Sequence, residues 1–367
     1  VHVPFCATRC DYCDFATWTD REHLVGQYVD ACITDIGRQF AGPRFAGRAA
    51  DTIFVGGGTP SLLAGPTLAR LLEAIPRAPD AEVTVECNPD SVDVTKLAVY
   101  RLAGVNRLSL GVQSMRPHVL AALGRTHDPD NVHEALDAAR ALGFERVNLD
   151  LIFGAAGETM ADWGETLDAA VALEPDHVSA YALTVVPSTP LGRSIAAGAT
   201  PATDDDDLAD KYHLAEARLA AAGLDWYEIS NWSRPGRECR HNLVTWSGGD
   251  YVAIGCAAHG HRRGERWWNV RTPERYIEAV TSDKCPRAGS ECLDARQRSE
   301  EVFSLGLRTR SGATVAAAAA GEVSALVRAG LLISDASRAR ATLSPAGRLL
   351  ADDITARLLL AGAAGRP

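Results

Sequence analysis

The sequence predicts an α/β fold built on a parallel sheet, and two observations support this. Short apolar, β-branched runs alternate with longer helical patterns; the runs are 1–5, 51–55, 82–86, 106–112, 146–153 and 177–184. Alternating strands and helices imply parallel strands joined by right-handed crossovers. Polar or glycine residues also follow successive runs at the same end, where the active site of a β/α barrel gathers. We therefore expect a partly closed barrel, a partial (β/α)6 arrangement, rather than an open doubly wound sheet.

The segment between the first two runs shows the clearest helical pattern. Leu24, Tyr28, Cys32, Ile36 and Phe40 recur every four residues. This spacing places them on one face of an amphipathic helix. The later segments between runs are interpreted as helices in the same way.

Three regions follow from changes in composition along the chain. Residues 1–230 carry the repeated strand–helix units and form the predicted barrel. Residues 231–293 are rich in Gly, Arg and Trp and are expected to form a connecting region with short strands between the barrel and the last region. Residues 294–367 contain an Ala-rich helical stretch followed by a helix–hairpin–helix pattern, which predicts a compact α+β module of winged-helix type.

The bulk properties exclude several classes of function. The chain has 367 residues, a net charge of −10 and a pI near 5.5, which argues against general nucleic-acid binding. No apolar stretch approaches the roughly 20 residues of a membrane span. Nine cysteines, an odd number of which three lie within the first thirteen residues, fit reduced thiols in a cytoplasmic protein better than a disulfide framework. The chain opens without Met, so we expect that a few residues precede Val1.

The stretch CATRCDYC places Cys6, Cys10 and Cys13 in the spacing C-x3-C-x2-C directly after the first predicted strand. Three thiolates can hold three corners of an iron–sulfur cubane and leave the fourth iron open. A zinc site is the competing interpretation, but it needs a fourth ligand, and no paired CxxC or HxxxH partner follows. Three unligated core thiols fit this polar stretch least well.

This motif resembles that of the radical S-adenosylmethionine (SAM) enzymes, whose three cysteines follow the first strand of a partial (β/α)6 barrel. The resemblance implies a [4Fe–4S] cluster on Cys6, Cys10 and Cys13, with SAM chelating the open iron. It also implies that further rim residues bind SAM. They are Gly56, Gly57, Gly58 and Thr59 in GGGTPS, Glu86 in ECNPDS, Gln113 in LSLGVQS, Arg125 in LGRTH and Asp150 in NLDLIFG.

Residues 227–260 and the C-terminal module resemble the branch of that family that contains the oxygen-independent coproporphyrinogen dehydrogenases and the heme chaperones. The dehydrogenases usually carry a further cysteine two positions after the third, where this chain has Phe15, and a longer N-terminal extension. Both departures favour a heme chaperone without dehydrogenase activity. The alternative is oxidative decarboxylation of coproporphyrinogen propionates to vinyl groups.

The composition of residues 231–275 suits a tetrapyrrole. Eight arginines stand there against four acidic residues, with four tryptophans among them. Arginine can pair with propionates, while aromatic rings lie on a flat macrocycle. Cys239, His241, His259 and His261 are the candidate iron ligands, although such residues more often have structural roles. A heme-linked motif of the chaperones, HN-x-x-YW, reads HNLVTW here, which makes His241 the first candidate.

The resemblance also implies partners. They are heme as cargo, heme-accepting proteins that include respiratory enzymes, and an electron donor for the cluster. Nucleic acid is not expected as a partner, and a homodimer remains an open alternative.

Overall fold

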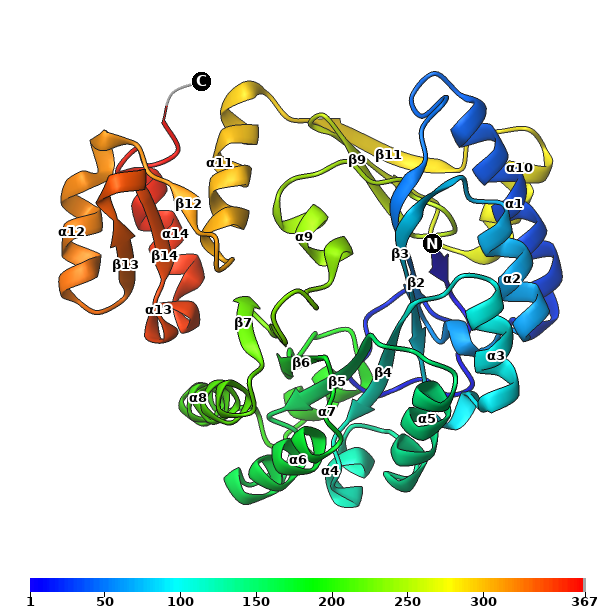
Figure 1. Ribbon diagram of the computed structural model, residues 1–367, viewed down its shortest axis with the longest axis horizontal. Coiled ribbons are helices and arrows are strands. Elements are labelled where there is room, and N and C mark those ends of the chain that lie inside the picture. The colour runs from blue at the N-terminus through cyan, green and yellow to red at the C-terminus, as the bar shows by residue number, and fades with distance from the viewer. Residues whose placement is uncertain (366–367) are drawn as a thin grey trace.

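The computed structural model describes residues 1–365, and its central element is a curved eight-stranded sheet in the order β1-β2-β3-β4-β5-β6-β8-β7 (Figure 1). The parallel strands are β1 (His2–Val3), β2 (Ala50–Gly57), β3 (Arg77–Cys87), β4 (Arg107–Gln113), β5 (Val147–Phe153) and β6 (His177–Ala182). The antiparallel strands β8 (Asn231–Ser233) and β7 (Asp225–Glu228) extend the sheet beyond β6. The predicted partial barrel is thus confirmed.

Helices cover the outer face of this sheet (Figure 1). They are α1 (Val25–Ala41), α2 (Gly65–Glu73), α3 (Val94–Leu102), α4 (Pro117–Ala122), α5 (Asp130–Ala141), α6 (Met160–Ala172), α7 (Pro190–Ala196) and α8 (Asp205–Ala221). Tyr28, Cys32 and Ile36 of α1 are buried, as the four-residue spacing predicts. Short 3₁₀ turns lie at Glu22–Leu24, Pro60–Leu62 and Pro89–Ser91.

Alternation along the strands separates an apolar outer face from a polar inner face. Val55, Val85 and Leu149 are fully buried in the main core. The side chains of the next residues in β3 and β5, Glu86 and Asp150, point to the opposite face of the sheet, toward the inside of the barrel. The helices therefore cover the apolar face, and the inside of the barrel is left for polar chemistry.

A small antiparallel sheet extends the barrel on the side of β1. It consists of β9 (His259–Arg262), β10 (Glu265–Asn269) and β11 (Arg287–Cys292), with α10 (Pro273–Thr281) between the last two strands. The His2 amide donates to the Ile254 carbonyl at 2.9 Å, which joins the two parts. Helix α9 (Arg240–Trp246) lies at the open side of the barrel (Figure 1).

The C-terminal module has its own apolar core. It contains α11 (Ala295–Leu307), β12 (Ala313–Thr314), α12 (Ala320–Arg328), β13 (Leu332–Asp335), β14 (Arg340–Leu343), α13 (Pro345–Leu349) and α14 (Ala351–Leu360), with 3₁₀ turns at Ala317–Ala319 and Ala336–Arg338. Its sheet is antiparallel in the order β12-β14-β13, which agrees with the predicted α+β module. The Arg310 amide donates to the Tyr227 carbonyl at 2.8 Å and so ties this module to β7.

The division of the chain into residues 1–230, 231–293 and 294–367 stays a proposal. Strand β8 begins directly after the first boundary and pairs with β6 of the main sheet. Among the described residues, no helix combines the length and the apolar composition that crossing a membrane requires.

Candidate functional site

The loop that carries the three cysteines, residues 6–17, begins where β1 ends. The Cys6 amide donates to the Trp18 carbonyl at 3.0 Å, and the Cys13 amide donates to the Cys10 carbonyl at 3.2 Å. All three thiols are free and half-buried. Burial raises the pKa of the Cys6 and Cys13 thiols, so they are protonated until a metal displaces the protons.

The glycine run lies directly against this loop. The Gly58 amide donates to the Val3 carbonyl at 2.8 Å, and the Thr59 hydroxyl lies 3.7 Å from the Cys6 sulfur. A Cβ atom on Gly58 would come within 2.9 Å of that sulfur. Glycine is therefore required here so that two backbone segments can approach the same thiol.

Glu86 at the end of β3 holds the same glycine run from the other side. Its carboxylate accepts the Gly57 amide at 3.0 Å. A Cβ atom on Gly56 would come within 2.7 Å of the same carboxylate oxygen. Burial, followed by the negative charge of Asp150, raises the pKa of Glu86 to about 7. A carboxylate poised in this range suits contact with a cationic ligand.

Arg125 connects the cysteine loop to the end of β4. One guanidinium nitrogen donates to the Gly111 carbonyl at 2.9 Å, and another lies 3.7 Å from the Cys10 sulfur. The side-chain amide of Gln113 folds toward Gly111, where a Cβ atom would meet its nitrogen at 3.1 Å. Gln113 has a φ of 62°, an uncommon left-handed conformation for a residue other than glycine.

Asp150 belongs to a polar network inside the barrel. Its two carboxylate oxygens accept from the Ser109 hydroxyl at 2.9 Å and the Asn148 amide at 2.8 Å. Asn148 in turn contacts His177, whose other ring nitrogen bonds to the Tyr227 hydroxyl at 2.7 Å. Burial raises the pKa of Asp150 and lowers that of His177. The sequence-based reasoning missed Asn148, His177 and Tyr227, although polar residues at every second position of these strands signal an inner face.

Most of the residues that the resemblance implied for the cluster and for SAM thus lie at or beside the carboxyl ends of β1 to β4, whereas Asp150 lies midway along β5, inside the barrel. Soft thiols from a single loop, bare glycine backbone, one buried carboxylate and one arginine form a donor set that fits an iron–sulfur cluster and an amino-acid ligand. Within residues 1–365, no three His, Cys, Asp or Glu side chains are arranged to hold one metal ion. Cubane ligands, by contrast, each bind a separate iron.

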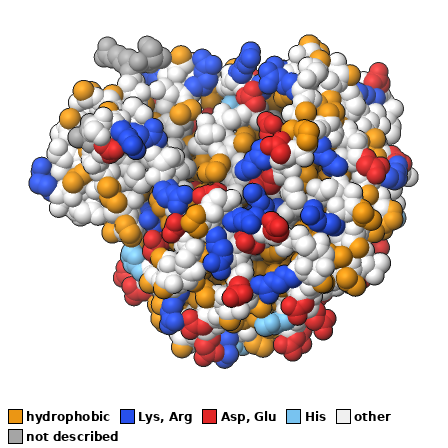
Figure 2. Space-filling view, in the orientation of Figure 1, with side chains coloured by type: hydrophobic (Ala, Val, Ile, Leu, Met, Phe, Trp, Pro, Cys, Tyr) orange, Lys and Arg blue, Asp and Glu red, His pale blue; other side chains and the backbone are white. Residues whose placement is uncertain are grey.

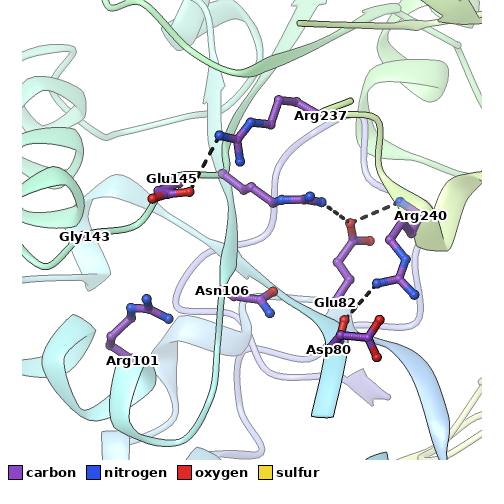
Figure 3. Close-up of a pocket in the computed structure, with 9 residues that line it drawn as sticks. Asp80, Glu82, Arg101, Asn106, Gly143, Glu145, Arg237 and Arg240 are labelled. Carbon is purple, nitrogen blue, oxygen red and sulfur yellow. Dashed lines mark hydrogen bonds and ion pairs between the residues drawn. The ribbon is translucent and has the colours of Figure 1, made fainter. Parts of the chain in front are cut away.

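Two cavities lie at opposite ends of the barrel. One of about 500 Å³ opens beside the cysteine loop, between Asp11 and the start of α7 at Pro190 and Leu191. The other, of about 170 Å³, is lined by charged residues near the amino ends of β3 to β5, including Glu82, Glu145, Arg146, Arg237 and Arg240 (Figure 3).

Glu82 in this second cavity anchors helix α9. The side chain is 2% exposed, and its two oxygens accept the backbone amides of Arg240 at 3.2 Å and His241 at 3.1 Å. The Arg146 guanidinium lies 3.3 Å from the same carboxylate. A buried carboxylate at a helix N-terminus is stabilised by the unpaired amides there. Sequence reasoning did not single out Glu82, because its partners come from a distant segment.

His241, the first candidate for heme, lies away from the cofactor rim. Its Nδ1 atom is 3.0 Å from the Thr52 hydroxyl, and its ring stacks on Phe54 at 5.2 Å between centroids. Burial lowers the pKa of His241 to about 4, so the imidazole is neutral near pH 7. The hydrogen bond at Nδ1 leaves Nε2 for a ligand.

The structure separates the other three candidate iron ligands. Cys239 is fully buried, and its sulfur lies 3.6 Å from the Glu82 carboxylate. His261 uses both ring nitrogens, bonding to the Gly249 carbonyl at 2.8 Å and the Gly264 amide at 3.2 Å. His259 is exposed. Cys239 and His261 therefore have structural roles, whereas His259 is accessible.

Comparisons with known proteins agree with this fold. The model of the Radical SAM superfamily matches residues 1–170. A solved structure from Escherichia coli, coproporphyrinogen III oxidase (HemN), described as a radical SAM enzyme, superposes with a TM-score of 0.83 at 23% identity, covering 97% of this chain and 88% of that one. The class defined by the fold and the site is therefore that of the radical SAM proteins, which implies a [4Fe–4S] cluster and SAM.

The full-length relatives define the family more narrowly. The heme chaperone HemW of Mycobacterium tuberculosis is 45% identical over 98% of this chain and 94% of its own length. HemW of Escherichia coli is 38% identical over 78% of this chain and 74% of its own length. The mouse mitochondrial radical S-adenosyl methionine domain-containing protein 1 is 36% identical over 86% of this chain and 73% of its own length. The chain belongs to the HemW family.

We expect Gly58→Ala to weaken assembly of the cysteine loop. The added methyl group would press on the Cys6 sulfur and on the Phe5 carbonyl, 2.7 Å away, and overpacking of this kind costs about 1–3 kcal/mol. Iron and sulfide content after anaerobic reconstitution should fall. Gly37→Ala in α1, where no atom lies within 4 Å of the new methyl group, is the control. Equal iron content in both variants would contradict the packing argument.

We expect Glu86→Gln to stabilise the cofactor-free protein at alkaline pH. The pKa of Glu86 rises from 4.5 to about 7 on folding, so the unfolded chain loses this proton first and stability falls between those pH values. Glutamine does not titrate, and its oxygen can still accept the Gly57 amide.

The free energy of unfolding in urea should therefore be higher for Glu86→Gln by about 1–3 kcal/mol at pH 8. The difference should disappear toward pH 4.5, because both side chains are then neutral. Glu73→Gln on the exposed face of α2 serves as the control. A stability difference that does not change with pH would contradict the assignment.

Proposed function

We propose that the protein binds heme and delivers it to heme-dependent proteins, including respiratory enzymes, as the names of its HemW relatives suggest. The observation that carries the proposal is the environment of His241. Its imidazole is neutral near pH 7, is fixed through Nδ1 by Thr52 and keeps Nε2 for iron. Neutral imidazole with its second nitrogen hydrogen-bonded is the usual form of a metal-binding histidine.

In this proposal the rim holds the resident cofactors. Cys6, Cys10 and Cys13 would bind the [4Fe–4S] cluster. SAM would lie against Gly56, Gly57, Gly58, Thr59, Glu86, Gln113, Arg125 and Asp150. When bound, the pair supplies one-electron chemistry at the open iron. The chain itself contributes a glycine backbone that allows close approach, a carboxylate for the amino group and an arginine for the carboxylate of SAM.

Coproporphyrinogen dehydrogenation is the second candidate function. The similarity of fold to HemN favours it, because the two chains superpose over 97% of this one. Phe15 opposes it, since it stands where the dehydrogenases usually carry a further cysteine, and it is 62% exposed on the cysteine loop. The chaperone is therefore the function that we propose.

The working environment and the partners are part of the same proposal. Free cysteines and an oxygen-sensitive cluster suit the reducing cytoplasm. An electron donor would reduce the cluster, and heme-accepting proteins would take the cargo. The cluster would stabilise the fold around its loop and would control heme release or dimerisation.

The test uses anaerobically reconstituted protein. We expect a titration with ferric heme to give a stable complex. Incubation with coproporphyrinogen, SAM and a reductant should give no vinyl product. His241→Ala should weaken heme binding about tenfold or more, because it removes an iron ligand. Turnover of coproporphyrinogen to a vinyl product would overturn the chaperone assignment, and so would absence of heme binding by the wild-type protein.

We expect Gln113→Ala to weaken SAM binding about tenfold while the visible absorption of the cluster survives. The Gln113 amide lies at the rim beside Gly111 but does not contact a cysteine. Gln27→Ala on the exposed face of α1 is the matched control. Equilibrium dialysis with labelled SAM measures both. Unchanged affinity in Gln113→Ala would show that the cofactor lies elsewhere on the rim.

A further inference from the structure

Helix α9 has an unusual position for an apolar segment. It lies at the open side of the barrel, between the sheet and the C-terminal module (Figure 1), yet none of its residues is buried. Leu243 is 38% exposed. Just beyond the helix, a Cβ atom on Gly248 would lie 3.3 Å from Val302 of α11, which is itself 52% exposed. Exposed apolar side chains of α9 and α11 therefore border the same space.

The small sheet forms a third wall of this space. Arg266 of β10 pairs with Glu301 of α11, and the His261 ring of β9 bonds to the Gly249 carbonyl just after α9. Because side chains alternate along strands, Trp268 shares the face of Arg266, and His259 shares that of His261. Trp268 and His259 therefore face the α9–α11 side of the sheet.

Trp268 offers a flat apolar surface within this wall. It is 36% exposed, and it packs across Gly289 of β11, where a Cβ atom would meet the indole at 2.4 Å. Trp267, by contrast, is fully buried on the opposite face, beneath the guanidinium groups of Arg44 and Arg287. The two adjacent tryptophans thus have different roles: Trp267 holds the sheet in place, and Trp268 remains accessible.

His259 lies beside Trp268, with 6.2 Å between the ring centroids. Within residues 1–365, neither of its ring nitrogens takes part in a hydrogen bond. Its backbone is nevertheless fixed, because the Ala257 amide donates to the Val270 carbonyl at 2.8 Å and the Asn269 amide to the Ala258 carbonyl at 2.9 Å. The strand therefore fixes the backbone of a residue whose two ring nitrogens are open to a ligand.

We infer that heme binds in this space, with its macrocycle against Trp268 and its iron within reach of His259. The inference rests on the proposed function and names the contact site for its cargo. A porphyrin needs an apolar surface for its ring and a ligand for its iron. Trp268 offers the surface, and the exposed imidazole of His259 beside it offers the ligand. Lys and Arg side chains gather near the middle of the face in Figure 2, among acidic ones, and could pair with the propionates.

His259 would give the iron a ligand in addition to His241, because the two histidines come from different elements, β9 and α9. His2 shows that His259 also lies near the cofactor rim. The His2 amide donates to the Ile254 carbonyl in the segment that leads to β9, and the His2 ring lies against Gly57 of the glycine run. Heme bound at Trp268 would therefore be a neighbour of the cluster and SAM.

The experiment compares ferric heme with metal-free protoporphyrin IX on the reconstituted full-length protein. His259→Ala should lower heme affinity about tenfold or more and shift the Soret band, but should leave protoporphyrin affinity unchanged. Trp268→Ala should lower both affinities about tenfold, and Trp268→Phe should restore most of the loss. His213→Ala on the exposed face of α8 is the matched control. Iron content and thermal unfolding check that each variant is folded.

The outcomes separate this inference from the function on which it rests. If the wild-type protein binds heme and both His259→Ala and Trp268→Ala bind it with wild-type affinity and spectrum, the site is wrong and the proposed function stands. If the loss occurs only in His241→Ala, the heme contacts α9 and not the small sheet. If the wild-type protein binds no heme, the proposed function itself fails.

Discussion

The pairing of β1 with both of its neighbours is the constraint on which the site depends. This strand has two residues, His2 and Val3, yet it pairs with β2 on one edge, while the His2 amide donates to the Ile254 carbonyl on the other. The first edge brings the cysteine loop against Gly58. The second fixes the turn that leads into β9. One short strand thus joins the barrel, the cysteine loop and the small sheet, because its backbone groups are paired on both sides.

Two buried carboxylates, Glu86 and Glu82, organise opposite ends of the inside of the barrel. At the carboxyl end, Glu86 holds the glycine run, and its raised pKa reflects the cost of burying a charge beside Asp150. Toward the amino end, Glu82 holds the start of α9 and so determines where His241 lies. The rim is suited to a polar cofactor, whereas the space beside α9 is suited to a flat apolar ligand. Cargo and cofactor would then occupy adjoining parts of one barrel.

Local sequence determined much of this architecture. The strand–helix alternation predicted the parallel sheet, since a buried parallel strand must be apolar and its crossover helix amphipathic. The spacing of Cys6, Cys10 and Cys13 predicted one loop with three thiols, because all three lie within one short segment, residues 6–13. Glycine and polar residues at strand ends predicted the rim, since carboxyl ends of parallel strands share one edge.

Contacts between distant segments were decided only by the tertiary structure. The sequence offered Cys239, His241, His259 and His261 as candidate ligands, with His241 first, but their environments depend on distant partners, as for His241 with Thr52, 189 residues away. The roles of Glu82 and of the tryptophan pair at 267 and 268 were likewise invisible. Local patterns specify which face of an element is apolar, but whether a polar atom is paired, buried or open depends on which segment packs against it.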